Sequence, residues 1–477
     1  MEPEPKQIRS YLEEMSKRSS ALSSSSFDDL LAYAEPFAPS VTISNPPNRC
    51  LIANTPATAN EPFLSIPFSK LITPDTPLAF LSQVNSLRPP QTQTTTHTHQ
   101  LITNSDLAII LNLLSLPQTH AYKKLLPSQS EFDAILPVTW SSSTLSSNLK
   151  GSSALISEIE SLKSSLSSLF SSVISKLSSP TTTFTDFLHA YCCISSRSFS
   201  IKDAADPNAP PTPALLPLID MCNHKRPRVC SYKKHGDRVV LTALIDLKPG
   251  DEVSITYGAK SSSELLRDYG FALGSEENTE PDGSSNDCVK ITIRDNFLVS
   301  FRAPGGGASY SYFCLSEGVN AVREKAEEGE ADFGFSGGEN GATSFEDFEE
   351  GDEEGEDDDF FGDDDDDEND GPDLLDIVER VALLESTLTT SLSNYDSPPT
   401  SSSPSCLIVL DNDVRIIKFY VKVCKAILKI AELVSKEVSV DEISKYLEEM
   451  KNMTEINEWE AVVAFCKLKL ALSKYFC

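Results

Sequence analysis

The chain lacks the hydrophobic segments of a membrane or secreted protein. No run of 18 apolar residues occurs in its 477 residues, and the first 15 mix acidic and basic side chains without an apolar stretch. We therefore predict no contact with a membrane and no secretion signal. The expected location is the cytoplasm or nucleus. A plastid stays open as an alternative because Ser-rich sequence follows at 19–26.

Basic charge is also scarce. The chain has 40 Lys and Arg against 71 Asp and Glu, which gives a net charge of −31 and disfavours nucleic acid as a partner. The segment 327–370 alone holds 23 acidic residues and no Lys or Arg, so the remainder carries only about −8. Such a segment buries too little apolar surface to fold alone, and we expect a disordered insertion. It either attracts basic proteins or serves as a solvated linker.

Metal-binding and phosphate-binding motifs are missing as well. The 11 cysteines include no CxxC pair, which favours a reducing compartment and argues against a disulfide framework. Cys222, His224 and Cys230 have no fourth ligand at zinc spacing, so we predict no metal. The three glycines at 305–307 precede no Lys-Ser/Thr, so they do not form a phosphate-binding loop.

The apolar periodicity divides the chain into β-rich and helical parts. Short strands are expected within 48–72 and 215–273, with Asn60 at a turn between the first two and further turns at 235–237 and 248–251. Three- and four-residue spacing predicts helices at 106–116, at 141–177 and from 184 to about 199. Amphipathic helices follow beyond Pro372 and in the last 25 residues.

Two motifs at 215–228 and 247–273 carry the strongest functional signal. The first reads LLPLIDMCNHKRPR and the second LKPGDEVSITYGAKSSSELLRDYGFAL. An Asn-His pair is thus followed 33 residues later by Tyr-Gly, with a Gly-Asp-Glu turn between them and Tyr-Gly-Phe after them. This combination resembles the C-terminal half of a SET domain, the β-rich fold of protein methyltransferases that use S-adenosylmethionine.

Upstream segments extend the resemblance in the same order. The opening strands at 48–73, a helical region at 120–153 and the Ser-Ser-Arg-Ser-Phe at 195–199 are similar to the rubisco large-subunit methyltransferase class. That class includes relatives that act on ribosomal proteins and an actin-histidine methyltransferase. The resemblance implies an α+β protein with a SET β-fold and a helical insertion, followed by an all-α C-terminal domain of the substrate-binding kind. The expected domains are 1–45, 46–275 with the insertion at about 101–180, and 276–477 with the acidic segment 327–370.

The resemblance also implies roles for individual residues. Tyr257 would be the catalytic residue, orienting the acceptor amine and the methyl group. Arg197 would pair with the cofactor carboxylate, Asn223 would hold its amino-acid part, and the backbone of His224 would bind the adenine. The remaining cofactor contacts would come from Asn48, Arg49, Cys50 and Phe271. The substrate channel would be formed by Phe199, Asp220 and Tyr269, with Asp220 also supporting the Asn-His loop.

The chemistry explains why such residues would be needed. A free lysine, with a pKa near ~10.4, is almost wholly protonated at neutral pH and cannot attack a methyl group. Burial among aromatic rings and repulsion from the sulfonium both favour the neutral amine. A tyrosine hydroxyl and backbone carbonyls can then accept weak CH···O contacts from the polarised methyl group.

Three readings follow. The first is an S-adenosylmethionine-dependent methyltransferase that modifies a lysine of a protein substrate. Ribosomal or other basic proteins are candidate substrates, and the enzyme is expected to be a monomer. Phe199, two residues after Arg197, favours lysine, because the histidine-directed members are expected to carry a smaller polar residue there. A histidine acceptor is the second reading. The third is an inactive SET scaffold that binds partners, since Asn48 and Cys50 stand where the class has glycines.

Overall fold

The computed structural model describes residues 26–34, 41–43, 50–74, 102–178, 181–202, 211–280, 283–293, 297–303, 374–395 and 403–436. The chain divides into two compact units. The first comprises Met1–Asp287 and Ser397–Asp413, and the second comprises Cys288–Asp396 and Val414–Cys477. The first unit thus extends beyond the expected boundary at 275 and takes in a later segment. The acidic segment and the helix predicted for the last 25 residues lie outside the described residues.

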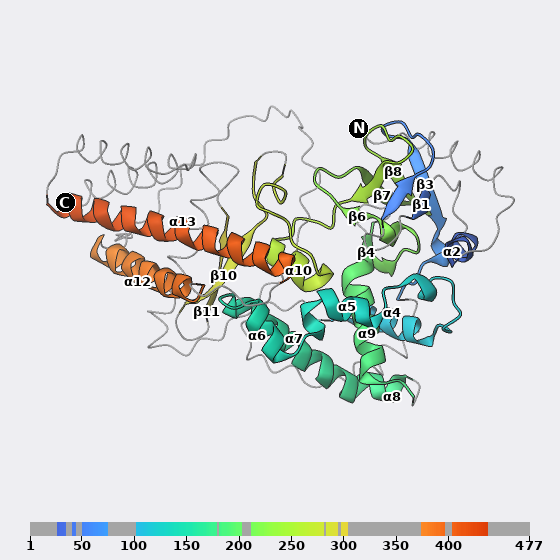
Figure 1. Ribbon diagram of the computed structural model, residues 1–477, viewed down its shortest axis with the longest axis horizontal. Helices are drawn as coiled ribbons and strands as arrows, with labels where there is room; N and C mark the ends of the chain where they lie inside the picture. The colour runs from blue at the N-terminus through green and yellow to red at the C-terminus, as the bar shows by residue number, and fades with distance from the viewer. Residues whose placement is uncertain are drawn as a thin grey trace, which may run out of the picture. The chain divides into compact units, whose positions relative to one another are not determined.

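Two sheets form the β-rich part of the first unit. The four-stranded sheet has the order β1-β2-β9-β6. The three-stranded antiparallel sheet has the order β3-β8-β7, and its strands are labelled in Figure 1. Strand β9 pairs antiparallel with β2 but parallel with β6. A separate hairpin joins β4 to β5. The bounds are β1 Val41–Ile43, β2 Leu51–Ala53, β3 Pro62–Pro67, β4 Ser198–Ile201, β5 Thr212–Leu215, β6 Asn223–His224, β7 Cys230–His235, β8 Arg238–Ala243 and β9 Glu252–Ile255.

These strands follow from local sequence. Each residue of β8 is buried, which suits its run of valine and leucine at the centre of the three-stranded sheet. The expected strands at 48–72 correspond to β2 and β3, and Asn60 between them has the positive φ of a turn residue, 66°.

The helical insertion lies between β3 and β4. Its helices are α4 Asn104–Ser115, α5 Gln129–Ile135, α6 Ser142–Asn148, α7 Ser153–Leu169 and α8 Ser175–Leu177, and α2 Ser26–Ala34 precedes it. Helix α9, Phe184–Arg197, follows and contacts α4, α5 and the later helix α10, Ser262–Tyr269 (Figure 1). Thr183 caps α9, because its side chain accepts a hydrogen bond from the Asp186 amide while Asp186 bonds back to Thr183. Helix α9 ends at Arg197 and leads directly into β4.

The first ten residues of helix α13, Pro404–Ser435, belong to the first unit. Cys406 and Val409 pack with Trp140 in a buried apolar cluster. Asn412 donates hydrogen bonds to the Leu273 carbonyl at 3.2 Å and to Asp287 at 3.0 Å. A segment more than a hundred residues away in sequence therefore completes this unit.

The second unit combines helices with a β-hairpin. Its described elements are β10 Cys288–Ile293, β11 Phe297–Arg302, helix α12 Leu374–Ser393 and the later part of α13. The sequence predicts an all-α domain here, and the hairpin corrects that prediction. The β-branched residues of β10 and the two phenylalanines and the valine of β11 explain it, since such residues suit a pleated surface. Within the described residues, no helix is both long and apolar enough to cross a membrane.

Candidate active site

Arg197, at the end of α9, forms a buried ion pair with Asp220. Its Nη1 atom donates to the Asp220 carbonyl at 3.0 Å and lies 3.2 Å from the carboxylate Oδ2. The same Oδ2 accepts a hydrogen bond from the hydroxyl of Tyr122 at 2.8 Å. The side chain of Asp220 is only 1% exposed, so two partners share the cost of burying its charge.

The backbone that presents Asp220 is strained. Leu218 has φ 79° and ψ −50° and begins a short 3-10 turn over Ile219–Met221. This conformation is that of a γ-turn, which is costly for a residue with a branched side chain. Leu218 is fully buried, so the surrounding core holds the turn in place. Such strain is typical of functional sites and fixes the direction of Asp220 and of the residues after it.

Asn223 and His224 form strand β6 beside β9. His224 pairs with Ile255, and Asn223 donates a hydrogen bond to Glu252 at 2.8 Å. The Nδ1 atom of His224 accepts a hydrogen bond from the backbone N–H of Tyr257 at 2.9 Å, so Nε2 carries the proton of the neutral ring. Burial, with a smaller contribution from the charge of Arg226, lowers the pKa of His224 to about 4. The ring is therefore neutral at physiological pH.

An aromatic cluster gathers around Tyr257. Its ring stacks on Tyr269 at a centroid distance of 4.6 Å, and Phe271 lies 6.2 Å from both rings. His224 closes the cluster at 5.2 Å from Tyr257. The Tyr257 hydroxyl donates to the carbonyl of Cys222 at 2.8 Å. Burial raises the pKa of Tyr257 and of Tyr269, so both hydroxyls stay protonated at neutral pH.

Two glycines let the chain build this cluster. Gly270 ends α10 in the left-handed conformation, φ 82°, and so turns Phe271 back toward Tyr269. A Cβ at Gly270 would lie 2.8 Å from the side chain of Ile135. Gly258, directly after Tyr257, has φ 96° with open space around it. The Tyr-Gly and Tyr-Gly-Phe motifs thus place glycine where the backbone conformation requires it.

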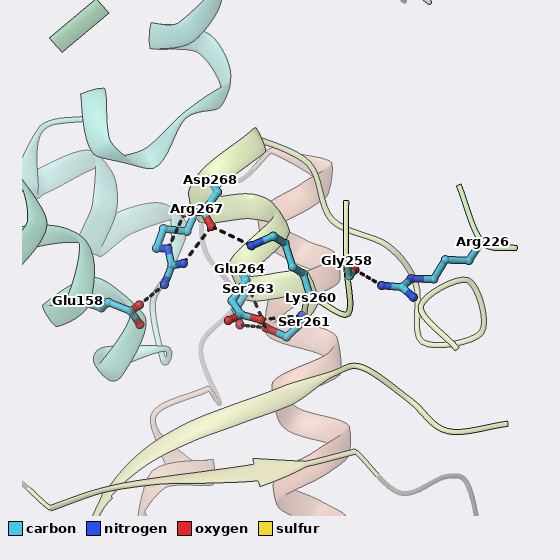
Figure 2. Close-up of polar contacts among 9 residues, drawn as sticks. All are labelled: Glu158, Arg226, Gly258, Lys260, Ser261, Ser263, Glu264, Arg267 and Asp268. Carbon is cyan, nitrogen blue, oxygen red and sulfur yellow. Dashed lines mark hydrogen bonds and ion pairs between the residues drawn. The ribbon is translucent and has the colours of Figure 1, made fainter. Parts of the chain in front are cut away.

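Arg226 connects the Asn-His segment to the loop after Tyr257. Its guanidinium donates to the carbonyl of Gly258, as Figure 2 shows, and forms an ion pair with Glu280. The side chain of Arg226 is only 5% exposed. These contacts join three segments that are distant in sequence. Arg226 therefore holds the Asn-His segment against the loop after Tyr257, a role that the sequence did not predict.

The remaining predicted residues are Phe199, Cys50, Asn48 and Arg49. Phe199 is buried on β4 and packs edge-on against Tyr232 of β7 at 5.0 Å. Cys50 is buried next to β2, so a side chain occupies a position where the resemblance predicts a glycine. Asn48 and Arg49 lie outside the described residues.

Sequence reasoning missed four contributors to this site: Tyr122, Glu252, Tyr232 and Arg226. Glu252 and Arg226 lie inside the two motifs at 215–228 and 247–273, so their charge next to predicted site residues could have marked them as part of the site. Tyr122 and Tyr232 come from the insertion and from β7, and no local pattern marks them.

Five buried polar atoms of these segments have no hydrogen-bond partner within the described part of the chain: Arg197 Nε, Asp220 Oδ1, His224 Nε2, Arg226 Nε and Ser254 Oγ. Arg197 Nε and His224 Nε2 are N–H donors, and Asp220 Oδ1 is a carboxylate oxygen. Buried polar atoms are normally bonded, and a group of orphaned ones points to a missing ligand with both acceptor and donor atoms. Among the residues that the structure describes, no cluster of His, Cys, Asp and Glu is arranged to hold a metal ion.

Comparison with known proteins shows what the sequence and the fold are similar to. Residues 48–258 match the family model of the SET domain. This match covers a little under half of the chain, and the fold is similar to solved SET structures over most of its length. The SET domain of LSMT bound to lysine and AdoHcy aligns with a TM-score of 0.52 at 15% identity, covering 84% of this chain and 90% of that one. Rubisco LSMT bound to AdoMet aligns with a TM-score of 0.52 at 16% identity, covering 86% and 93%.

Curated relatives share a shorter segment. Actin-histidine N-methyltransferase from Gallus gallus is 32% identical over 112 residues, which is 23% of this chain and 17% of the relative. The protein of that name from Homo sapiens is 31% identical over 112 residues, which is again 23% of this chain and 17% of the relative. The chain spans about a sixth of the length of these relatives.

Proposed function

We propose that this protein is an S-adenosylmethionine-dependent protein N-methyltransferase whose acceptor is a lysine side chain. The single observation that carries the proposal is the joint placement of the aromatic cluster and the Arg197–Asp220 pair on a SET fold. Neither half of this arrangement alone would select a methyltransferase.

The orphaned polar atoms fit the cofactor. S-adenosylmethionine carries a carboxylate and adenine nitrogens that accept hydrogen bonds, and an ammonium that donates them. Arg197 Nε and His224 Nε2 are buried donors, and Asp220 Oδ1 is a buried acceptor. In our proposal Arg197 and Asn223 hold the amino-acid part, and the backbone of His224 binds the adenine. When bound, the cofactor would supply an electrophilic methyl group on a sulfonium.

The protein's own residues would align the acceptor and favour its neutral form. Tyr257 and Tyr269 form the closest stacked pair of the cluster, with protonated, buried hydroxyls. An amine bound against this aromatic cluster loses its hydration, which favours its neutral form. As the amine nitrogen bonds to the methyl carbon, the carbon–sulfur bond breaks, and the proton of the product ammonium passes to water. Tyr257 orients both partners of this in-line transfer.

The acceptor type is the finer part of the proposal. Phe199 supports lysine, because it stands two residues after Arg197, and its contact with Tyr232 adds an apolar wall. Histidine is the second candidate, because the curated relatives are named actin-histidine N-methyltransferase. Amino-acid analysis of a labelled product separates the two, since methyllysine and methylhistidine elute differently. A protein substrate, a monomeric state and a cytoplasmic or nuclear location are part of the same proposal; size-exclusion scattering and imaging of a tagged chain test the last two.

Calorimetric titration of the full chain with S-adenosylmethionine and S-adenosylhomocysteine tests the function. We expect micromolar binding that falls at least tenfold in Asn223→Ala. Asn112→Ala is the matched control and should leave binding unchanged. Asn112 lies on α4, is also half-buried, and its side chain donates a hydrogen bond to the Thr73 carbonyl at 2.9 Å. No binding by folded wild type would reject the enzyme in favour of an inactive scaffold, consistent with Cys50 standing where the class has a glycine.

A further inference from the structure

Lys260 links a charged network to the aromatic cluster. It lies three residues after Tyr257, just before α10, and its ammonium stands 5.8 Å from the ring centroid of Tyr269. The same ammonium lies 3.7 Å from Oδ2 of Asp268 (Figure 2). Its backbone carbonyl accepts a hydrogen bond from Asn278 at 3.1 Å, which fixes the main chain.

The network continues from Asp268 into the helical insertion. Arg267 grips the Asp268 carboxylate with two hydrogen bonds, Nε to Oδ1 at 2.7 Å and Nη2 to Oδ2 at 2.9 Å. Arg267 also pairs with Glu158 of α7 (Figure 2). The four charges alternate in sign, and three of the side chains are 10–13% exposed. Lys260, 24% exposed, ends the series at Tyr269.

The charges next to Tyr269 oppose one another. Asp268 raises the pKa of Tyr269, after burial, whereas Arg267 lowers it. The carboxylate of Asp268 is therefore felt at the tyrosine, and by any amine bound beside it. A carboxylate at this place would stabilise an ammonium and so oppose methyl transfer. Arg267 already pairs with this carboxylate, and Lys260 adds a second positive charge 3.7 Å from Asp268 Oδ2 and 5.8 Å from the Tyr269 ring centroid.

We infer that Lys260 is a positioning residue of the acceptor site: its ammonium neutralises Asp268 beside Tyr269 and so keeps an incoming lysine amine in its uncharged, reactive form. This inference rests on the proposed function and adds a residue to it. Other groups also face the cluster. Tyr232 and Tyr257 act on Tyr269, while Arg197, Asp220, Cys222 and Glu252 act on Tyr257. A change at Lys260 alone leaves all of them in place.

The test compares Lys260→Met, which keeps the length of the side chain but removes its charge, with the charge-preserving Lys260→Arg. Free L-lysine is the probe, titrated into the full chain saturated with S-adenosylhomocysteine. Calorimetry in buffers of different ionisation enthalpy gives the number of protons released per lysine bound between pH 7 and pH 10. Lys248→Met is the matched control, because Lys248 is exposed on the turn at the opposite end of β9.

We expect wild-type protein to release a proton on binding lysine, since the side chain of free lysine, with a pKa near ~10.4, is mostly protonated across this range. In Lys260→Met the pKa of the bound amine should rise by about one unit, so the release curve moves to higher pH. Lys260→Arg and Lys248→Met should follow the wild type. If the proton-release curve of a folded Lys260→Met variant matched that of the wild type, Lys260 would only anchor α10, and the inference would be overturned. Absent lysine binding by wild type would also overturn it, together with the lysine acceptor, whereas failure to bind S-adenosylhomocysteine would reject the proposed function itself.

Discussion

The neutral state of His224 predicts a pH-dependent stability of the site. Burial holds its folded-state pKa at about 4, against about 6.5 for an exposed histidine. Between these values the unfolded chain binds more protons than the folded one, so stability rises with pH. The contribution is fully present above pH 6.5 and is lost as the pH falls toward 4.

The size of the effect follows from the two pKa values. Linkage gives a loss of about 2 kcal/mol on going from pH 8 to pH 5. Because the ring is only partly buried, solvent screening reduces the expected value to between about 1 and 2 kcal/mol. That is a large fraction of the stability of an average domain.

The informative variant is His224→Asn, whose side-chain oxygen can still accept the Tyr257 N–H but does not titrate. Hydrogen exchange of peptides from β6 and β9 measures the local opening free energy at pH 8 and pH 5. Other titrating groups are common to both proteins, so the difference between them isolates His224. The reasoning is refuted if wild type and variant lose the same opening free energy over this range.

Two further predictions concern the aromatic cluster. Gly270→Ala should destabilise the protein by more than about 2 kcal/mol, whereas Gly258→Ala should destabilise it by about 1 kcal/mol. Both glycines have positive φ, but only a Cβ at Gly270 meets a neighbour. Equal losses of unfolding free energy in urea titrations would contradict the crowding at Gly270. Tyr257→Phe should bind S-adenosylmethionine like wild type but transfer the methyl group about 100-fold more slowly in single-turnover assays, because a positioned hydroxyl is lost; an unchanged rate would remove Tyr257 from catalysis.

Much of the fold could be read from local patterns. The strands within 48–72 and the helix ending at Arg197 follow from apolar spacing and from a capping box, which act over a few residues. The hairpin of β10 and β11 was not predicted, because its strands are short and the segments that follow in the sequence have helical periodicity. The extent of the first unit was also beyond local reasoning, because Asn412 returns to it from far along the chain.

The sequence by itself determined which chemical groups are available and their order: an Arg-x-Phe, an Asn-His pair and a Tyr-Gly with glycines placed for positive φ. Tertiary structure decided how those groups interact. Parallel pairing of β6 with β9 brings His224 to the backbone of Tyr257 across 33 residues. Tyr122 reaches Asp220 across 98 residues, inside a core that no local spacing encodes. Hydrogen bonds and ring stacking act over a few ångströms, so they depend on packing between segments that only the folded chain brings together.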